Sequence, residues 1–306
     1  MYHIIVNPTS RSERGLDTWI KVKKKLLFRH VKFQAYITKY QGHAKEIVWK
    51  LTGETWNPKD VLVIIGGDGT LNEVVNGIQR LSDVTLGYIP TGSGNDFARG
   101  LGTPTDPVEC LNRILNPKRV MEIDIGKNII DGKSRRFNIS TGIGYDAGIC
   151  HEASYSRIKD VLNRLKMGKL TYICIALRQL ASFTPCTIDV LPENGQRIRF
   201  KKAFFAVAMN LPYEGGGCKF TPEATADDGL LDVMIVSKIS KLKVLMIFPL
   251  AIKGYHTHLK AVHMIKCRSI IVHTDKGMPV HLDGESGGYQ KRMEISLENQ
   301  RLKLLV

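Results

Sequence analysis

The stretch VLVIIGGDGTLNEVVNGIQRL, residues 61–81, constrains the fold more than any other part of the chain. Five apolar residues, 61–65, run without a polar break into a loop that contains three glycines. An unbroken apolar strand is typical of a parallel sheet, because helices cover both of its faces. The stretch therefore predicts a buried strand, a tight loop and a helix that begins near Thr70.

The first third of the chain repeats this alternation. Strand patterns lie at 2–6, 31–38, 61–65 and 84–89, and helical patterns lie at 16–27 and 43–51. Strands that alternate with helices favour βαβ units and a mainly parallel sheet flanked by helices. An α/β domain is therefore expected at the N-terminus.

The pattern changes after residue 120. Alternating apolar residues surround Asp131-Gly132 and Asn194-Gly195, and such dipeptides between alternating runs are strong hairpin signals. Helical patterns lie near 155–182 and 241–262. The second part of the chain is therefore expected to be antiparallel β structure interrupted by helices.

The length of 306 residues suits two domains, since single cores seldom grow beyond about 250–300 residues. We predict an α/β nucleotide-binding domain over 1–120 and an antiparallel β-sandwich domain over 121–294. The last residues, 295–306, are expected to pack back onto the first domain.

The composition indicates a soluble, cytoplasmic protein with an anionic partner. No segment has the ~18 apolar residues of a membrane-spanning helix, and the six cysteines include no C-x-x-C pair. The formal net charge is +15. This excess suits a nucleotide, a membrane surface or a nucleic acid, but plain solubility explains it equally well.

The loop after residue 65 has the features of a phosphate site. Gly66, Gly67 and Gly69 allow the backbone to approach a ligand closely. Thr70 and Glu73 have the spacing of a capping box, and a helix N-terminus attracts phosphate. Asp68 would suit a metal or a ligand hydroxyl, although a capping aspartate in a tight turn is an equal alternative.

A second loop, IPTGSGNDFARGLG at 89–102, follows the next strand. Its glycines, Thr91 and Ser93 offer further amides and hydroxyls, and Asn95 or Asp96 is expected to cap the following helix. Neither loop is a Walker A motif or a dinucleotide fingerprint. Two such loops after consecutive strands predict a phosphate cradle.

The two loops in this order, GGDGTLNEVVNG and PTGSGNDFAR, closely resemble the catalytic domain of diacylglycerol kinases, and most of all the soluble bacterial lipid kinases. The segments NPTS (7–10), FNISTGIGYDA (137–147), EATADDGLLDV (223–233) and HLDGE (281–285) extend the resemblance. It implies an ATP- and Mg2+-dependent kinase whose active site lies between an α/β domain and a β-sandwich.

The resemblance also implies roles for individual residues. Contacts to ATP are carried over to Asn7, Ser10, Thr38, Gly66, Gly67, Asp68, Gly69, Thr70, Leu71, Asn72 and Ser93. Asp283 would be the general base for the lipid hydroxyl, and Glu285 would support it through a metal-linked water network. Asp228, with the carbonyl groups of Thr225 and Leu230, corresponds to a magnesium site.

Simpler alternatives accompany these roles. An Asp-Gly hairpin turn explains Asp283, and a solvated turn explains Asp228. The family often has NPxSG where this chain has NPTSRSERG, so Arg11 or Arg14 could meet a phosphate. The irregularly spaced histidines of the second half, His281 among them, are interpreted as surface or packing residues.

Two basic, apolar segments, 155–183 and 241–256, are candidates for contact with anionic lipid. Helices that pack on the sandwich are the alternative. The leading function is phosphorylation of diacylglycerol or a related lipid alcohol by a peripherally membrane-associated enzyme. A kinase of a soluble hydroxyl substrate such as NAD is the alternative, and a non-catalytic membrane- or nucleic-acid-binding protein ranks last. No nucleic-acid partner is expected, and a homodimer is left open.

Overall fold

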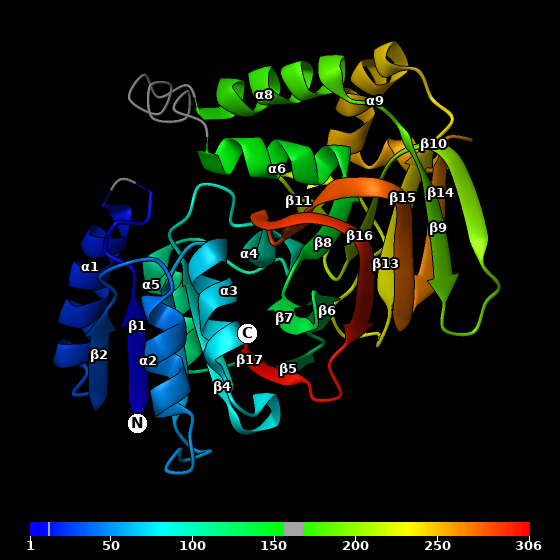
Figure 1. Ribbon diagram of the computed structural model, residues 1–306. Coiled ribbons are helices and arrows are strands. Elements are labelled where there is room, and N and C mark those ends of the chain that lie inside the picture. Colours follow the sequence, from blue (N-terminus) through cyan, green and yellow to red (C-terminus); the bar gives the residue numbers. More distant parts are fainter. Residues whose placement is uncertain (12, 156–167) are drawn as a thin grey trace.

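The computed structural model describes residues 1–11, 13–155 and 168–306. Within these residues the chain forms an α/β domain and an antiparallel β domain that lie side by side (Figure 1). The first domain is built on a six-stranded sheet and the second on a nine-stranded sheet. This arrangement confirms the predicted fold class.

The first sheet is mainly parallel. Its strands are β1 (Tyr2–Val6), β2 (Phe33–Ile37), β3 (Val61–Gly66), β4 (Thr85–Pro90), β5 (Val120–Ile123) and β17 (Leu302–Leu305). Their order is β2-β1-β3-β4-β17-β5, and only β5 runs antiparallel to its neighbour.

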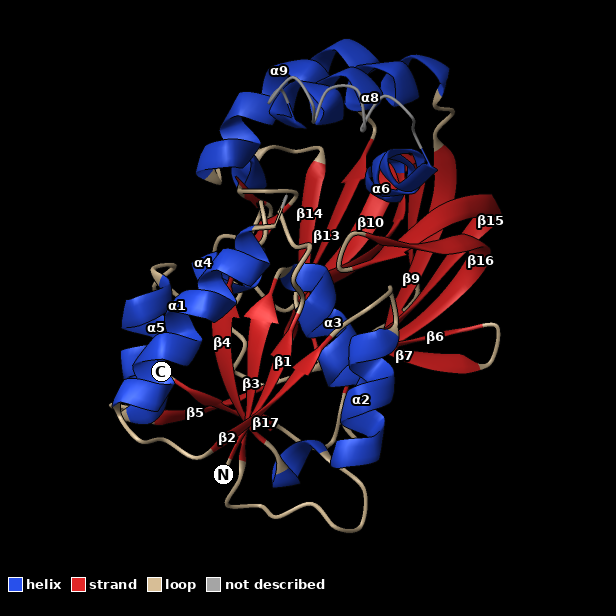
Figure 2. Ribbon diagram, turned by 90° about the vertical axis from the view of Figure 1, so that its left-hand side faces the viewer, coloured by secondary structure: helices blue, strands red, loops and turns tan. Residues whose placement is uncertain are grey.

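Helices cover both faces of this sheet. They are α1 (Arg14–Phe28), α2 (His43–Leu51), α3 (Asp68–Gly77), α4 (Asp96–Gly100) and α5 (Pro107–Leu115), with a 3-10 turn η1 (Leu81–Asp83). Side chains of a strand point alternately to opposite faces. Val63 packs with α1 and α5, whereas Leu62 and Ile64 pack with α2 and α3 (Figure 2). The unbroken apolar run of β3 is therefore explained by burial on both sides.

The C-terminal strand β17 returns to the first sheet and lies between β4 and β5. The chain end therefore packs on the α/β domain, although β16 keeps residues up to Leu297 in the second sheet. Because β5 belongs to the first sheet, that sheet extends to Ile123 and does not end at residue 120.

The second sheet is antiparallel throughout. Its strands are β6 (Gly126–Ile130), β7 (Lys133–Phe137), β8 (Ser140–Gly144), β9 (Cys186–Pro192), β10 (Ile198–Met209), β13 (Leu231–Ser237), β14 (Val262–Cys267), β15 (Ser269–Leu282) and β16 (Glu285–Leu297). A short hairpin, β11 (Tyr213–Glu214) and β12 (Cys218–Lys219), stands apart. Strand β9 pairs with both β10 and β15, so the sheet folds over a separate apolar core.

Among the described residues, three helices lie above one end of this domain (Figure 1). They are α6 (Tyr145–Tyr155), α8 (Gly168–Ser182) and α9 (Lys241–Lys253), and a 3-10 turn η2 (Tyr255–His258) follows α9. The predicted helix at 241–262 is too long, because Gly254 has φ 79 and ends it. The predicted helix at 155–182 is represented by α8, and part of it lies outside the described residues.

Candidate active site

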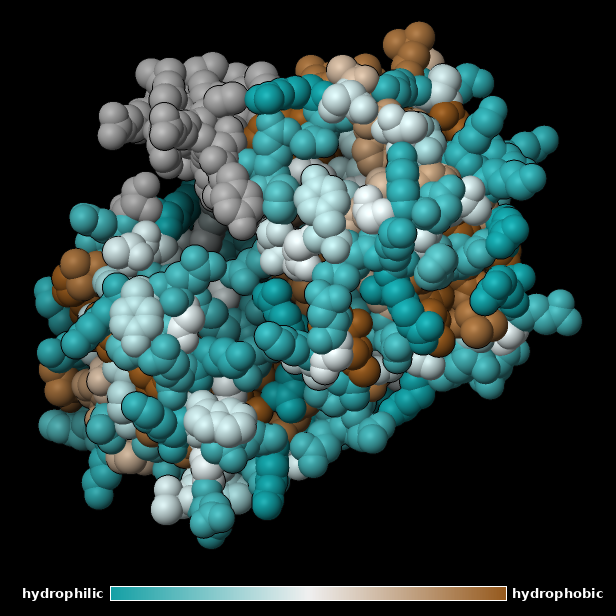
Figure 3. Space-filling view, in the orientation of Figure 1, coloured by the Kyte–Doolittle hydropathy of each residue, from teal (hydrophilic) through white to brown (hydrophobic). Residues whose placement is uncertain are grey.

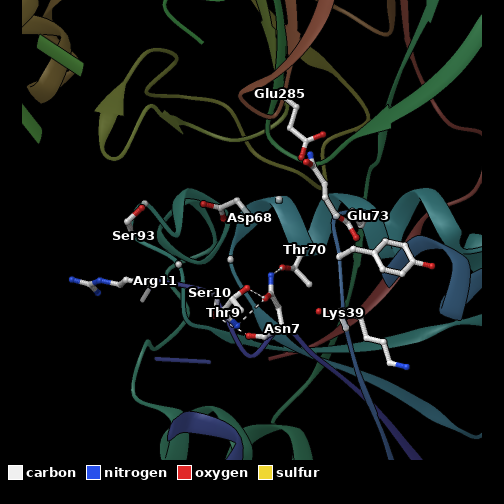
Figure 4. A pocket seen from close by; sticks show the side chains of 17 residues that line it. Asn7, Thr9, Ser10, Arg11, Lys39, Asp68, Thr70, Glu73, Ser93 and Glu285 are labelled. Atoms are coloured by element: carbon white, nitrogen blue, oxygen red, sulfur yellow. Dashed lines mark hydrogen bonds between the residues drawn. The ribbon is translucent and has the colours of Figure 1, made fainter. Parts of the chain in front are cut away.

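The site is a cleft of about 480 Å³ at the carboxyl ends of the parallel strands. Loops that follow β1, β2, β3 and β4 form its floor, and Glu285 at the start of β16 enters from the second domain (Figure 4). The lining residues are Asn7, Thr9, Ser10, Arg11, Thr38, Lys39, Tyr40, Gln41, Gly67, Asp68, Gly69, Thr70, Glu73, Gly92, Ser93, Gly94 and Glu285. Ligands of open α/β sheets bind at this edge.

Most residues with an expected nucleotide role meet here. Asn7, Ser10, Thr38, Gly67, Asp68, Gly69, Thr70 and Ser93 line the cleft. Three others do not. Gly66 packs against Thr70, Leu71 is buried in the core, and Asn72 bonds to the second domain.

Short hydrogen bonds hold the loops of the cleft together. The Nδ2 group of Asn7 donates to Thr70 Oγ1 at 2.8 Å. The hydroxyl groups of Ser10 and Thr91 are 2.6 Å apart. The loop after β1 is therefore bonded to the first turn of α3 and to the loop after β4, so the floor of the cleft is a connected unit.

The N-terminus of α3 opens toward the cleft. Its first intrahelical bond joins Leu71 N to Gly67 O, so the N–H groups of Asp68, Gly69 and Thr70 have no carbonyl partner within the helix. Such N–H groups attract anions. This geometry supports the predicted phosphate cradle.

The predicted capping box at this helix is wrong. Thr70 lies inside α3, and its hydroxyl accepts from Asn7. Glu73 instead accepts from Gly42 N at 2.8 Å and Ala44 N at 3.2 Å. It therefore caps α2, whose free N–H groups lie beside it in space but far away in sequence.

Asp68 caps the neighbouring helix α4. Its carboxylate accepts from the backbone N–H groups of Asp96 at 3.1 Å and Phe97 at 3.3 Å. Neither Asn95 nor Asp96 caps α4 through its own side chain, so that expectation is also wrong. Burial, reinforced by the charge of Asp96, raises the pKa of Asp68 to about 6. Asp68 therefore joins the two glycine-rich loops at the edge of the cleft.

Asp283 and Gly284 form the two-residue turn between β15 and β16. Their φ angles are 47 and 82, and Leu282 pairs with Glu285 across the turn. Positive φ at both positions is characteristic of the tight hairpin turn that Asp-Gly favours. The turn projects toward α3, which belongs to the first domain.

Five hydrogen bonds surround the carboxylate of Asp283. The donors are the backbone N–H groups of Asn138 (2.8 Å), Ile139 (2.8 Å) and Ser140 (3.0 Å), and the side-chain amides of Asn72 (2.7 Å) and Asn138 (3.1 Å). Asp283 is not among the residues that line the cleft. Its side chain joins the two domains, because Asn72 lies on α3.

Glu285 is the acidic group of this hairpin that faces the cleft. One carboxylate oxygen lies 3.5 Å from Arg135 Nη2, and the other would lie 3.6 Å from a Cβ atom on Gly69. Burial raises the pKa of Glu285, and Arg135 opposes this shift. A carboxylate thus stands opposite the N-terminus of α3.

Comparison with known proteins agrees with this geometry. The family model "Diacylglycerol kinase catalytic domain" matches residues 1–128, and the model "YegS C-terminal NAD kinase beta sandwich-like domain" matches residues 141–306. The chain belongs to the diacylglycerol kinase family. It is a kinase, and the relatives that it matches over nearly its whole length are named as bacterial diacylglycerol kinases and lipid kinases.

Individual relatives match this kinase over nearly its whole length. YtlR of Bacillus subtilis (strain 168) is 32% identical and covers 94% of each chain. A diacylglycerol kinase of the same organism is 30% identical over 93% of this chain and 89% of its own. A diacylglycerol kinase of Staphylococcus saprophyticus is 32% identical over 93% of this chain and 88% of its own.

Solved structures share the fold of the kinase. A diacylglycerol kinase from Bacillus anthracis str. Sterne has a TM-score of 0.70 at 23% identity and covers 99% of this chain and 96% of its own. An NAD kinase from Archaeoglobus fulgidus in complex with ATP has a TM-score of 0.53 at 12% identity and covers 100% of this chain and 94% of its own.

A buried charge cluster lies behind the hairpin of the kinase. His281 is fully buried, and its Nε2 atom is 3.2 Å from a carboxylate oxygen of both Asp146 and Glu214. Burial lowers the pKa of His281, but these two carboxylates outweigh it and raise the pKa to about 9. His281 is therefore a buried charged group, which no spacing in the sequence revealed.

This cluster contains residue types that bind metals, but the ring nitrogen that a metal would need already faces two carboxylates. Cys150, Glu214 and His281 offer ligand atoms within 4.8 Å of one another. However, Nε2 of His281 lies 3.2 Å from a carboxylate oxygen of both Asp146 and Glu214, so the proton of the charged ring at this nitrogen lies between the two carboxylates. A metal would need that nitrogen, so we interpret the cluster as an ion-pair network.

The expected magnesium loop lies outside the cleft. Asp228 Oδ1 accepts from Leu230 N at 2.9 Å, and Thr225 precedes it in the same loop. Arg301 already supplies positive charge here, since it pairs with Asp124 at 2.8 Å and donates to the carbonyl of Asp227 at 3.2 Å. None of Thr225, Asp228 and Leu230 lines the cleft.

Within the described part of the chain, no helix is long and apolar enough to cross a membrane.

Proposed function

We propose that this kinase transfers the γ-phosphoryl group of ATP to the hydroxyl group of diacylglycerol, or of a related lipid alcohol, at an anionic membrane surface. With diacylglycerol the product is phosphatidic acid. The position of Glu285 carries the proposal, because its carboxylate faces the same cleft as the two glycine-rich loops. A proton acceptor and a phosphate cradle thus share one cavity.

The triphosphate would lie along the loops of the first domain. The N–H groups at the start of α3 and the hydroxyl groups of Thr38 and Ser93 are available to phosphate oxygens. Arg11 and Lys39 add positive charge at the rim (Figure 4). Asn7 and Ser10 support the loops through their bonds to Thr70 and Thr91.

Magnesium bound with the nucleotide would neutralise phosphate charge during transfer. Three carboxyl groups, those of Asp68, Glu73 and Glu285, line the cleft and would need such neutralisation near a polyanion. The turn of Thr225, Asp228 and Leu230 lies outside the cleft, so a cation held there would be structural. No catalytic step is assigned to it.

The proton of the lipid hydroxyl is assigned to Glu285. A general base must reach the hydroxyl and have a vacant lone pair, and its pKa is best raised toward the working pH. Glu285 fits all three conditions, whereas five donors already surround Asp283. Asp283 would then act as a positioning residue, because it fixes the hairpin that presents Glu285.

A soluble acceptor is the alternative. The fold similarity to the NAD kinase from Archaeoglobus fulgidus favours NAD as the acceptor to test. The acceptor preference distinguishes the two functions, because the cleft chemistry suits either hydroxyl.

An acceptor competition tests the proposal. The protein is incubated with γ-labelled ATP, Mg2+, diacylglycerol in mixed micelles and an equal concentration of NAD, and the organic and aqueous phases are counted. We expect label in an organic-soluble phospholipid. Label found only in aqueous NADP, or in neither acceptor, would overturn the proposal. Glu294→Gln, at a half-buried position on β16 outside the cleft, serves as the matched control for Glu285→Gln.

A further inference from the structure

Helix α9 presents an apolar surface to solvent. Its side chains Leu242, Leu245, Met246, Leu250 and Ile252 are exposed, by 67% for Leu242 and 58% for Met246. Of the α9 side chains that the structure describes, Ala251 alone is buried. A surface helix normally turns its apolar side chains toward the core, so this helix has an unusual outer face.

The charges on α9 are of one sign. The helix sequence KLKVLMIFPLAIK contains Lys241, Lys243 and Lys253 and no acidic residue. Lysines therefore lie at both ends of the exposed apolar residues. This combination is typical of helices that lie in the plane of a membrane interface and are attracted to anionic lipids.

The position of the helix also suits a flat surface. Helices α8 and α9 lie side by side at one end of the molecule (Figure 1), and apolar side chains appear at that edge in the space-filling view (Figure 3). Tyr255, at the start of η2, is 65% exposed, and Leu177 on α8 is also exposed. The apolar residues thus extend across neighbouring elements.

We infer that the outer face of α9 docks this kinase on the surface of an anionic lipid bilayer. The inference rests on the proposed lipid kinase function, and it names the surface through which the enzyme reaches its substrate. A second copy of the chain fits less well, because two α9 faces would bring their lysines together in a protein of net charge +15.

A chain of contacts connects this face to the hairpin that carries Glu285. Lys241 Nζ donates to the carbonyl of Ala181 at the end of α8, at 2.7 Å. Helix α8 in turn pairs with α6 through Arg178 and Glu152 at 3.2 Å. A bilayer that contacts α9 would therefore lie against the same group of helices that meets the active-site hairpin.

The contact of α6 with the hairpin completes this connection. His151 Nδ1 and Ser286 Oγ are 2.7 Å apart. Ser286 follows Glu285 directly, so the docking helices are anchored next to the proposed proton acceptor.

Sedimentation with vesicles tests the inference. The full-length protein is mixed with vesicles of phosphatidylcholine containing phosphatidylglycerol, or of phosphatidylcholine alone. We expect wild type to sediment with the anionic vesicles and to bind more weakly at high salt. The double variant Leu245→Glu/Met246→Glu should bind at least tenfold more weakly. Its activity on diacylglycerol in detergent micelles should stay within twofold of wild type, since neither residue lines the cleft.

Phe28→Glu provides the matched control. Phe28 is 85% exposed at the end of the lysine-rich helix α1, in the other domain, and its variant should bind vesicles as wild type does. Equal vesicle binding by wild type and the α9 double variant would overturn the inference. So would a change from dimer to monomer in that variant, because the face would then belong to a second copy.

The two proposals fail separately. If the protein phosphorylates diacylglycerol in micelles but the α9 double variant binds vesicles as wild type does, the docking surface is overturned and the proposed function stands. Vesicle binding through α9 without phosphorylation of any lipid would support the docking surface and overturn the proposed function.

Discussion

At the scale of single residues, the surroundings of a carboxyl group decide what it can do. Asp283 and Glu285 are separated by one glycine, yet the first is enclosed by five donors and the second faces a cavity. The sequence predicted that this pair is important. It could not predict which of the two faces the cleft, because the donors to Asp283 come from residues 72 and 138–140.

Replacing Asp283 by asparagine tests its structural role. The amide group would turn an N–H donor toward other donors, so the free energy of unfolding should fall by ~2–3 kcal/mol. Denaturant unfolding measures this change. Asp131→Asn is the control, since Asp131 occupies the same position of the β6–β7 hairpin with φ 49. Its variant should stay within ~0.5 kcal/mol of wild type. An unchanged stability of Asp283→Asn would refute the positioning role.

The raised pKa of Asp68 predicts a pH-dependent stability. The pKa is about 6 in the folded chain against 3.8 ordinarily, so the folded state binds more protons between these values. Stability from this group is therefore lost as the pH rises from about 4 to 6, by at most ~3 kcal/mol. Asp68→Asn lacks this group. The free energy of unfolding is measured for both proteins from pH 4 to 7. That of the variant should rise relative to that of wild type as the pH increases. A difference between the two that stays constant with pH would contradict the raised pKa.

At the scale of elements, local sequence patterns predicted a turn or a helix correctly where the residues that bond to one another are close in sequence. The Asp131-Gly132 turn has the expected positive φ angles of 49 and 73. The strand–loop–helix units also appear as predicted. Capping was predicted wrongly, because the partners lie far apart in sequence: Glu73 caps α2 and Asp68 caps α4. Sequence spacing finds a cap only when it belongs to its own helix.

The cross-helix cap of Glu73 can be measured. Glutamine has one acceptor oxygen, so Glu73→Gln keeps only one of the two bonds to the N-terminus of α2. The free energy of unfolding should fall by ~1 kcal/mol. Glu54→Gln, at an exposed position in the loop after α2, is the control and should change it little. Equal stabilities of the two variants would show that the cap contributes nothing.

At the scale of the whole molecule, the two domains are interlocked by the chain end. Strand β17 lies between β4 and β5, so residues that follow the second domain in the sequence complete the first sheet. The sequence suggested this return, but the exact pairing could not be read from it. The buried network of Asp146, Glu214 and His281 was equally hidden, because its members meet only when α6, β11 and β15 converge.

Removing a side chain of β17 tests how much this insertion contributes. Leu302 is fully buried against the first sheet, so Leu302→Ala should lower the free energy of unfolding by ~2–5 kcal/mol. Leu27→Ala, at an exposed position of α1, should cost less than ~0.5 kcal/mol. Similar losses for both would mean that the terminal strand is not integral to the domain.

The central claim is that Glu285 accepts the proton of a lipid hydroxyl in this cleft. Single-turnover transfer of label from ATP to diacylglycerol in micelles tests it most directly, with wild type and Glu285→Gln compared at several pH values. We predict a rate ~10²–10⁴-fold lower for the variant, loss of the wild-type fall in rate at acid pH, and an unchanged free energy of unfolding. A variant that transfers label within threefold of the wild-type rate would contradict the claim.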